Sequence, residues 1–194
     1  MSDKELNMLE ELLNKVTEEN YEKYCKFVGR FPALVSGEVL SYLRGVNYFT
    51  APSSFKFHGD WIGGNFDHSM KVTEFLLEYT AEEGLKWERE ESPYIIGLFY
   101  DMCKCDQRGF KLKNDEVKII SLNPIDNRHS EKSIELIEDH IIKMTVEEKL
   151  CVYYHMGEYG GDYDYQVLMA KMMENNPNIG FVQKADTVAA KMGI

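Results

Sequence analysis

The sequence lacks any apolar run long enough to cross a membrane, and it has little positive charge. A membrane-spanning helix needs about 20 consecutive apolar residues, and no stretch approaches that length. Lysine and arginine together number 22 against 33 aspartates and glutamates, so the net charge is -11. A surface this negative repels phosphate backbones, which disfavours a nucleic-acid partner. A small phosphorylated ligand stays compatible, because a metal ion can invert the charge of a pocket.

Cysteine is scarce, and its spacing fits no zinc motif. The four cysteines are Cys25, Cys103, Cys105 and Cys151, and no two of them have the C-x-x-C spacing of a zinc knuckle. Residues 1–16 are acidic with a helical period, unlike a secretory signal, so the expected compartment is the cytoplasm, where thiols stay reduced. Cys103 and Cys105 flank a single residue, which is a weak sign of metal binding. The main interpretation is four reduced structural thiols.

Apolar residues recur at helical spacing along most of the chain. Two apolar stripes within residues 9–28 predict helix there, and a further helix is expected to begin after residue 67. The other expected helices span residues 35–45, 93–104, 129–143, 145–154 and 177–192. Asp67 is the expected cap of one helix, and Thr145 with Glu148 forms a capping box for another. Only EVKIISL, residues 116–122, favours a strand. The sequence therefore predicts an all-α bundle of about seven to nine helices.

The first 45 residues are expected to form an extension of the main domain. We expect residues 1–45 to be a helical cap packed on a core domain that spans residues 46–194. The apolar stripes of this segment would otherwise be exposed to water over a large area. The alternative is that an exposed face serves the interface of a homo-oligomer.

Histidine and aspartate residues stand where expected helix ends can meet. His68, His129 and His155 lie at or near such ends, and Asp101 ends another helix. Asp186 lies among apolar residues of the last expected helix. A buried carboxylate is unfavourable unless it is paired or bound to metal, and separated His and Asp side chains suit a divalent ion. For each residue alone, the alternative is a hydrogen-bonded side chain of the core.

Five short stretches of sequence favour a metal site over hydrogen-bonded side chains of the core. They are FTAPSSFKFHGDWIGGNFDHSMKV, GLFYDMCK, RHSEKSIELI, YYHMGEY and VQKADTVAAKM, in this order over roughly residues 48–192. Together they resemble the signature of a bacterial and phage subgroup of HD-domain metal-dependent phosphohydrolases. The resemblance implies an HD-type helical bundle, whereas activity has to be argued from the site itself.

Carried over by position, the resemblance implies a centre for one or two divalent metal ions. The first ion would be held by His68, Asp101 and Asp186, and the second by His129 and His155, with Asp101 bridging the two. The metal stays open among Mn, Fe, Co, Ni, Zn and Mg.

The sequence departs from the family pattern at the first metal position. Tyr100 stands where the family usually has a histidine, next to Asp101. Neutral tyrosine is a poor ligand, because its pKa near 10 must first be suppressed. It could coordinate as a phenolate or donate a hydrogen bond to a metal-bound water, and either way we expect a weakened first site. The other departures are Ser130 for glycine and Tyr153-Tyr154 for Arg-Trp.

The resemblance implies hydrolysis of a phosphoester in a nucleotide or another small phosphorylated metabolite. The metal would activate water and neutralise phosphate charge with Asp101 as a ligand, and Lys104, one turn later, would assist. His58 or His129 would serve as the general acid. Further substrate contacts are implied for Tyr100, Glu131 and Lys132. The alternative is a degenerate protein that binds a nucleotide or a partner without turnover.

Overall fold

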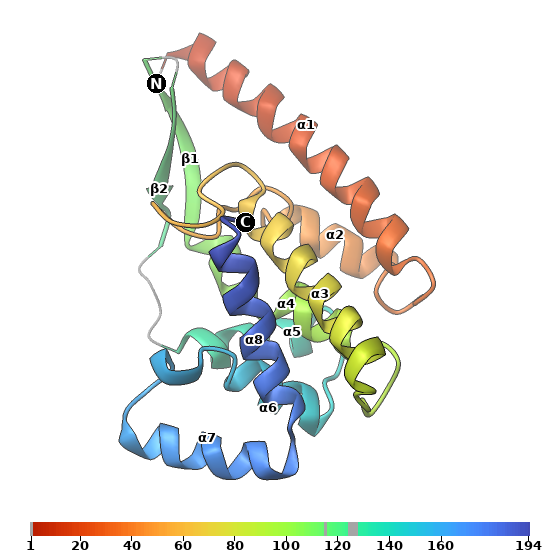
Figure 1. Ribbon diagram of the computed structural model, residues 1–194. Helices are drawn as coiled ribbons and strands as arrows, with labels where there is room; N and C mark the ends of the chain where they lie inside the picture. The colour runs from red at the N-terminus through yellow and green to blue at the C-terminus, as the bar shows by residue number, and fades with distance from the viewer. Residues whose placement is uncertain (1, 115, 124–127) are drawn as a thin grey trace.

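Eight α-helices and a two-stranded sheet make up the part of the chain that the computed structural model describes, residues 2–114, 116–123 and 128–194 (Figure 1). The α-helices are α1 (Asp3–Val28), α2 (Gly37–Gly45), α3 (Gly64–Glu83), α4 (Ser92–Phe99), α5 (His129–His140), α6 (Val146–Tyr153), α7 (Tyr163–Asn175) and α8 (Asn178–Lys191). Two short 3₁₀ helices are η1 (Met102–Asp106) and η2 (Gly157–Tyr159). The predicted all-α bundle is confirmed, including the expected number of helices.

Helix α4 lies at the centre of the bundle. All eight of its residues are buried, because the segment SPYIIGLF is almost wholly apolar and presents no charged face. Helix α3 packs along it, and Gly97 permits the close approach, since a Cβ there would lie 2.4 Å from Thr73 Oγ1. This contact fixes the end of α4 against α3, and Tyr100 and Asp101 follow that end directly.

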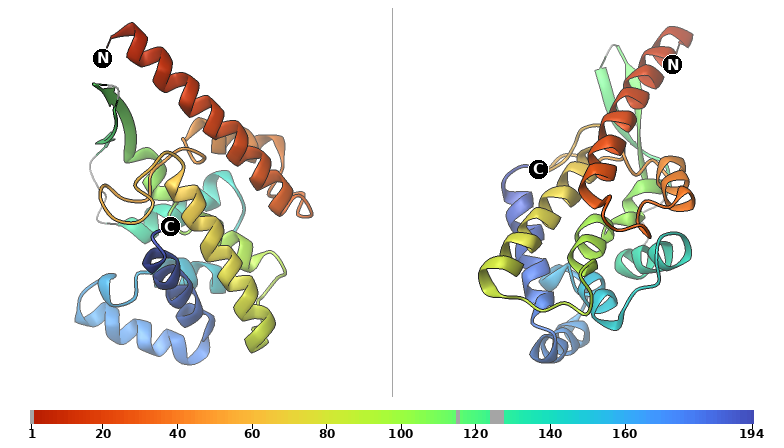
Figure 2. Two further views of the ribbon diagram at one scale, coloured as in Figure 1. Left: turned by 45° about the horizontal axis from the view of Figure 1, so that its top comes forward. Right: turned by 90° about the vertical axis from the view of Figure 1, so that its right-hand side faces the viewer.

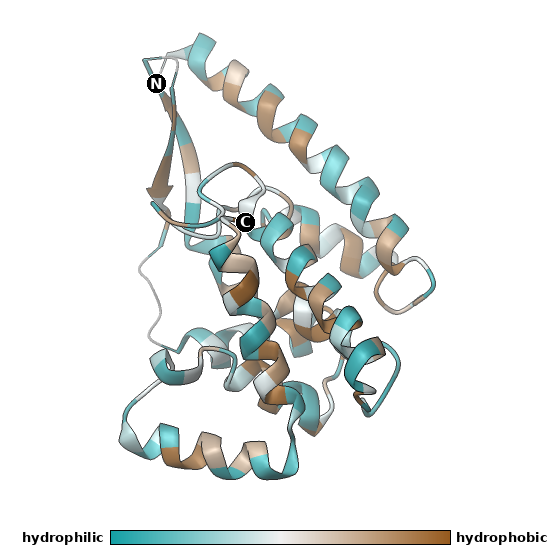
Figure 3. Cartoon of the chain, in the orientation of Figure 1, coloured by the Kyte–Doolittle hydropathy of each residue, from teal (hydrophilic) through white to brown (hydrophobic). Residues whose placement is uncertain are grey.

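One hydrophobic core runs through both parts of the expected domain division. Buried side chains of α1 and α2, such as Tyr24 and Leu43, belong to the same core as those of α3, α4 and α8. In Figure 3 the hydrophobic stretches of α3, α4 and α8 lie toward the middle of the bundle. A division of the chain at residue 45 therefore stays a prediction, and residues up to 45 contribute to the core.

The first half of α1 projects from the bundle beside a hairpin (Figure 2). The hairpin pairs β1 (Arg108–Lys113) antiparallel with β2 (Glu116–Ser121), with Leu112 opposite Val117. Leu9 of α1 and Leu112 of β1 are buried although they lie outside the main bundle, because helix and hairpin cover each other. The described helices include none that is both long and apolar enough to cross a membrane.

Several expected boundaries are wrong, each for a local reason. The helix expected over residues 93–104 ends at Phe99, and η1 follows because the Lys104 N–H bonds to the Asp101 carbonyl three residues back. Asp67 lies inside α3, whose N-cap is Gly63 at φ 85°, a conformation that favours glycine. The helix expected over 129–143 ends at His140. Strand β1 and helix α7 were not expected, whereas the capping box of Thr145 and Glu148 is confirmed.

A buried carboxylate, Glu148, ties α6 to the start of α4. It accepts hydrogen bonds from Arg89 at 2.8 and 2.7 Å and from Ser92 Oγ at 2.8 Å, and its side chain is 0% exposed. Helix α4 leads into Asp101 and α6 leads into His155. The network therefore holds together the two helices whose ends carry candidate site residues.

Replacing Glu148 with alanine should destabilise the fold strongly. Arg89 would be left without its carboxylate, and breaking a buried ion pair typically costs about 3–5 kcal/mol in the free energy of unfolding. We expect a loss of this size in urea unfolding near neutral pH. Glu138→Ala removes the more exposed pair with Lys149 and should cost less than about 1 kcal/mol. Equal losses for the two variants would contradict this account of Glu148.

Candidate metal centre

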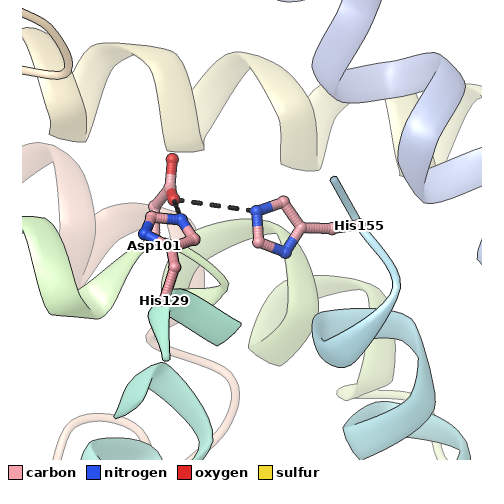
Figure 4. Close-up of side chains that lie close together, drawn as sticks. All are labelled: Asp101, His129 and His155. Atoms are coloured by element: carbon pink, nitrogen blue, oxygen red, sulfur yellow. Dashed lines mark hydrogen bonds and ion pairs between the residues drawn. The ribbon is translucent and has the colours of Figure 1, made fainter. Parts of the chain in front are cut away.

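Asp101, His129 and His155 meet inside the bundle (Figure 4). His129 Nε2 lies 2.7 Å from Asp101 Oδ1, and His155 Nε2 lies 3.8 Å from the same oxygen. One ligand atom from each of the three residues lies within 4.8 Å of the others. Asp101 and His155 are buried and His129 is half-buried. This Asp-His-His triad could hold a metal ion, because two imidazoles and a carboxylate are a common donor set for divalent metals.

Three ends of short helices bring the triad together, as the sequence analysis expected. Asp101 follows α4 and caps η1, His129 is the first residue of α5, and His155 comes two residues after the end of α6. Helix α5 packs against η1 and α6, and α6 packs against α4. Side chains at the ends of these packed helices therefore point into one place.

The environment of His155 fits a cation. Its Nδ1 lies 2.7 Å from the Val152 carbonyl, so this nitrogen carries the proton and donates it. Nε2 is then an acceptor, and it is buried without a hydrogen-bond partner among the described residues. A buried polar atom without a partner is unfavourable. A metal ion beside Asp101 would supply the missing partner, so the residues present fit the expected group.

The charges around Asp101 favour its ionised form. Burial alone would raise the pKa of Asp101, but the ammonium of Lys104 and the ring of His129 outweigh it and hold that pKa well below its ordinary value. Lys104 Nζ donates to Oδ2 at 2.5 Å, which leaves Oδ1 to the histidines. Burial lowers the pKa of His155, so its ring is neutral at pH 7. Two of the three triad members are therefore already in the protonation state that a metal requires.

His68, Tyr100 and Asp186 form a second polar cluster next to the triad. His68 Nε2 and the Tyr100 hydroxyl lie 2.9 and 2.8 Å from Asp186 Oδ1. Burial, together with the Asp186 and Asp101 carboxylates, raises the pKa of Tyr100 well above its usual value. Tyr100 is thus a neutral phenol that donates to Asp186, and its ring edge contacts His155 with 4.8 Å between ring centroids. The five expected metal ligands therefore fall into two adjoining groups that Tyr100 connects.

A cleft of about 1110 Å³ opens onto both groups. Its lining includes Phe57, His58, His155, Tyr159 and Asp186. The His58 ring lies 4.7 Å from that of His68, so the loop before α3 brings this expected substrate contact to the cleft. Ligand sites commonly measure about 300–1,000 Å³, so the cleft has room for a small metabolite.

The remaining predicted substrate contacts lie around the triad. Lys104 lies against Asp101 as described. Glu131, in the first turn of α5, lines a separate cavity of about 140 Å³ together with His129. Lys132 pairs with Asp106 at 2.7 Å, so its ammonium is engaged with η1 rather than with the triad.

Cys103 contacts the triad, although the main interpretation of its sequence context was a structural thiol. Its Sγ lies 3.0 Å from His129 Nδ1, and the side chain is fully buried. Histidine ligands of metals usually present their second nitrogen to a fixed partner, which sets the tautomer and the orientation of the ring. The sequence signals were the position of Cys103 two residues after Asp101 and its weak metal-binding spacing to Cys105.

No family model matches the sequence, and no curated protein and no solved structure matches it either. The geometry of the site and the short resembling stretches therefore carry the functional argument together.

Metal binding should release a proton from His129. Burial opposes the charged ring, but hydrogen bonds to Asp101 and Cys103 raise the pKa of His129 to about 10. In the metal-free protein at pH 7 the ring therefore carries a proton on Nε2 that a metal must replace. Below that pKa, affinity should rise about tenfold per pH unit. Calorimetric titration with Mn²⁺ in buffers of different ionisation enthalpy should show about one proton released per ion. An affinity that is the same at pH 6 and pH 8 would contradict this expectation.

Removing the sulfur of Cys103 should weaken metal binding. His129 Nδ1 would lose its partner, and such losses typically lower metal affinity about 10–100-fold. Cys103→Ser keeps a polar partner and should retain more of the affinity than Cys103→Ala. Cys105→Ala removes a second buried thiol that forms no hydrogen bond to the triad, so it serves as the matched control. Competition against a chelating dye measures all three variants, and equal affinities would exclude a role for the sulfur.

Proposed function

We infer that the protein is a metal-dependent phosphohydrolase that acts on a nucleotide or another small phosphorylated metabolite. The observation that carries this proposal is the buried triad with Lys104 against it, of which His155 lines a cleft large enough for a metabolite. The sequence stretches that resemble HD-domain phosphohydrolases supply these same residues. The net charge of -11 favours a small phosphorylated ligand over a nucleic acid.

A divalent ion at the triad would supply activation of water and neutralisation of phosphate charge. The contribution of Lys104 follows from its position, because its side chain is only 13% exposed and its ammonium lies against Asp101. A fixed cation in such surroundings stabilises negative charge that develops on a phosphoryl group more strongly than the same cation in water. Lys104 therefore acts as an electrostatic stabiliser in this proposal.

His58 fits the role of general acid better than His129. As a metal ligand, His129 gives up its Nε2 proton and cannot donate it to a leaving group. Burial, and then the neighbouring His68 and Lys104, lower the pKa of His58, so its ring is neutral before substrate binds. A phosphate dianion nearby favours the protonated ring, which then can donate to the leaving oxygen.

A binding protein without turnover is the second candidate, and Tyr100 is the observation that favours it. The phenol occupies the position of an expected imidazole, and its hydroxyl binds Asp186, an expected ligand. Its raised pKa opposes the phenolate form that would coordinate a metal. The pocket could then hold a phosphorylated ligand through its cations alone.

Metal analysis and a substrate screen separate the two candidates. The purified protein would be loaded in turn with manganese, cobalt, iron and magnesium, and release of inorganic phosphate would be measured over a panel of nucleotides and sugar phosphates. The phosphohydrolase proposal predicts that Asp101→Asn has no turnover. It also predicts that the wild type loses turnover on dialysis and regains it when the metal is added back. Tight nucleotide binding without phosphate release would favour the second candidate.

Replacing Tyr100 with histidine should strengthen metal binding. An imidazole at this place binds borderline divalent ions without the deprotonation that tyrosine requires. We expect the variant to keep more metal after dialysis than the wild type and, in a working hydrolase, to turn over at least as fast. Tyr100→Phe removes the hydroxyl without adding a donor, so it should not gain metal. Unchanged metal content in Tyr100→His would place residue 100 outside the coordination sphere.

A further inference from the structure

Arg108 differs from the other arginines of the chain in having no carboxylate partner among the residues that the structure describes. Each of the other four forms an ion pair with a glutamate: Arg30 with Glu90, Arg44 with Glu18, Arg89 with Glu148 and Arg128 with Glu135. Arg108 forms no ion pair with any carboxylate in residues 2–114, 116–123 and 128–194. In a chain with an excess of acidic residues, an arginine that has no carboxylate partner in the described part of the chain is unexpected.

The surroundings of Arg108 leave its charge poorly compensated. The side chain is half-buried, and its Nε is buried without a hydrogen-bond partner among the described residues. Nη1 donates to the Ser53 carbonyl, and the guanidinium carbon lies 5.2 Å from the ring centroid of Phe55. Burial lowers the pKa of Arg108, with Asp101 acting weakly in the opposite direction. A half-buried cation with only these contacts is unfavourable until an anion binds it.

Arg108 stands next to the triad through one shared residue. Ser53 accepts from Arg108 through its carbonyl oxygen and from Lys104 Nζ, at 3.4 Å, through its hydroxyl. Lys104 in turn contacts Asp101 of the triad. The Ser53 N–H donates to the Gly59 carbonyl at 2.8 Å, and this bond anchors the loop to which both cations donate hydrogen bonds. Two cations therefore converge on one residue beside the candidate metal centre.

We propose that Arg108 is an anion-binding residue of this site, which holds a phosphoryl group of the ligand beside Lys104. The identity of the anion rests on the proposed phosphohydrolase function, whereas the need for an anion rests on a guanidinium that has no carboxylate partner among the described residues. Arginine suits this task because its planar fork of N–H donors matches the oxygens of a phosphoryl group. Arg108 begins β1, and its pairing with Ser121 fixes the backbone that carries it.

The test uses inorganic phosphate as the probe and the full chain after dialysis against EDTA, so that no metal contributes to binding. Arg108→Gln removes the charge and the fork. Lys111→Gln is the matched control, because Lys111 is exposed on the same strand and its replacement changes the net charge by the same amount. The dissociation constant for phosphate would be obtained from the rise of the melting temperature with phosphate concentration and checked by calorimetry.

We expect phosphate to raise the melting temperature of the wild type and of Lys111→Gln alike. In Arg108→Gln the affinity should fall about 10–100-fold, as expected for loss of a hydrogen-bonding charge. Without phosphate, Arg108→Gln should be at least as stable as the wild type, because an uncompensated cation has been removed. If Arg108 were purely structural, Arg108→Gln would instead have a lower melting temperature than the wild type in phosphate-free buffer.

The outcomes for Arg108 and for the proposed enzyme are distinguishable. Phosphate binding that depends on Arg108 in a protein that hydrolyses nothing would support the anion site and reject the phosphohydrolase. Hydrolysis with unchanged phosphate affinity in Arg108→Gln would support the enzyme and overturn this inference. Absence of phosphate binding to the wild type, or equal loss in Arg108→Gln and Lys111→Gln, would also overturn it.

Discussion

The buried carboxylate of Asp101 is compensated by two cations, Lys104 and the protonated His129, and it also faces the unprotonated nitrogen of His155. Oδ2 binds the ammonium of Lys104, and Oδ1 faces His129 and His155. A carboxylate in this position without those partners would be unfavourable by several kcal/mol. The fold meets the requirement by ending α4 at Phe99 and by bringing η1, the start of α5 and the end of α6 to the same place. In the metal-free protein the proton on His129 compensates the charge of Asp101, and a metal ion at the triad would do so in its place.

Two cations lie beside the candidate site of a chain that is acidic as a whole. The net charge is -11, yet Lys104 and Arg108 lie within a few contacts of Asp101, and both bind Ser53. Cations at the site would attract a small phosphorylated ligand to an otherwise acidic protein. Tyr100 connects this site to the adjoining cluster of His68 and Asp186, because it contacts both His155 and Asp186. Its neutral hydroxyl donates to Asp186, so the two clusters are joined by a hydrogen bond where an imidazole ligand was expected.

Elements whose signals are local could be predicted from the sequence. The capping box of Thr145 and the buried α4 follow from caps and apolar runs, whereas the meeting of Asp101, His129 and His155 was expected chiefly from the resemblance to HD-domain phosphohydrolases. Cys103 and Arg108 could not be placed in this way, because their roles depend on neighbours that are distant in sequence. Arg108 also lies in a strand whose segment, RGFKLK, is too polar to indicate β-structure clearly. The sequence left open a phenolate at Tyr100, which complete burial among carboxylates disfavours.

The central claim is that Asp101, His129 and His155 bind one metal ion, and anomalous diffraction from crystals grown with Mn²⁺ tests it most directly. We predict an anomalous peak within coordination distance of Asp101 Oδ1 and of Nε2 of both histidines, because carboxylate and imidazole are ligands that a divalent ion accepts. His155→Ala crystals grown under the same conditions should show a weaker peak or none. A fully occupied Mn²⁺ that lies elsewhere, or its absence from the wild type at saturating concentration, would contradict the account.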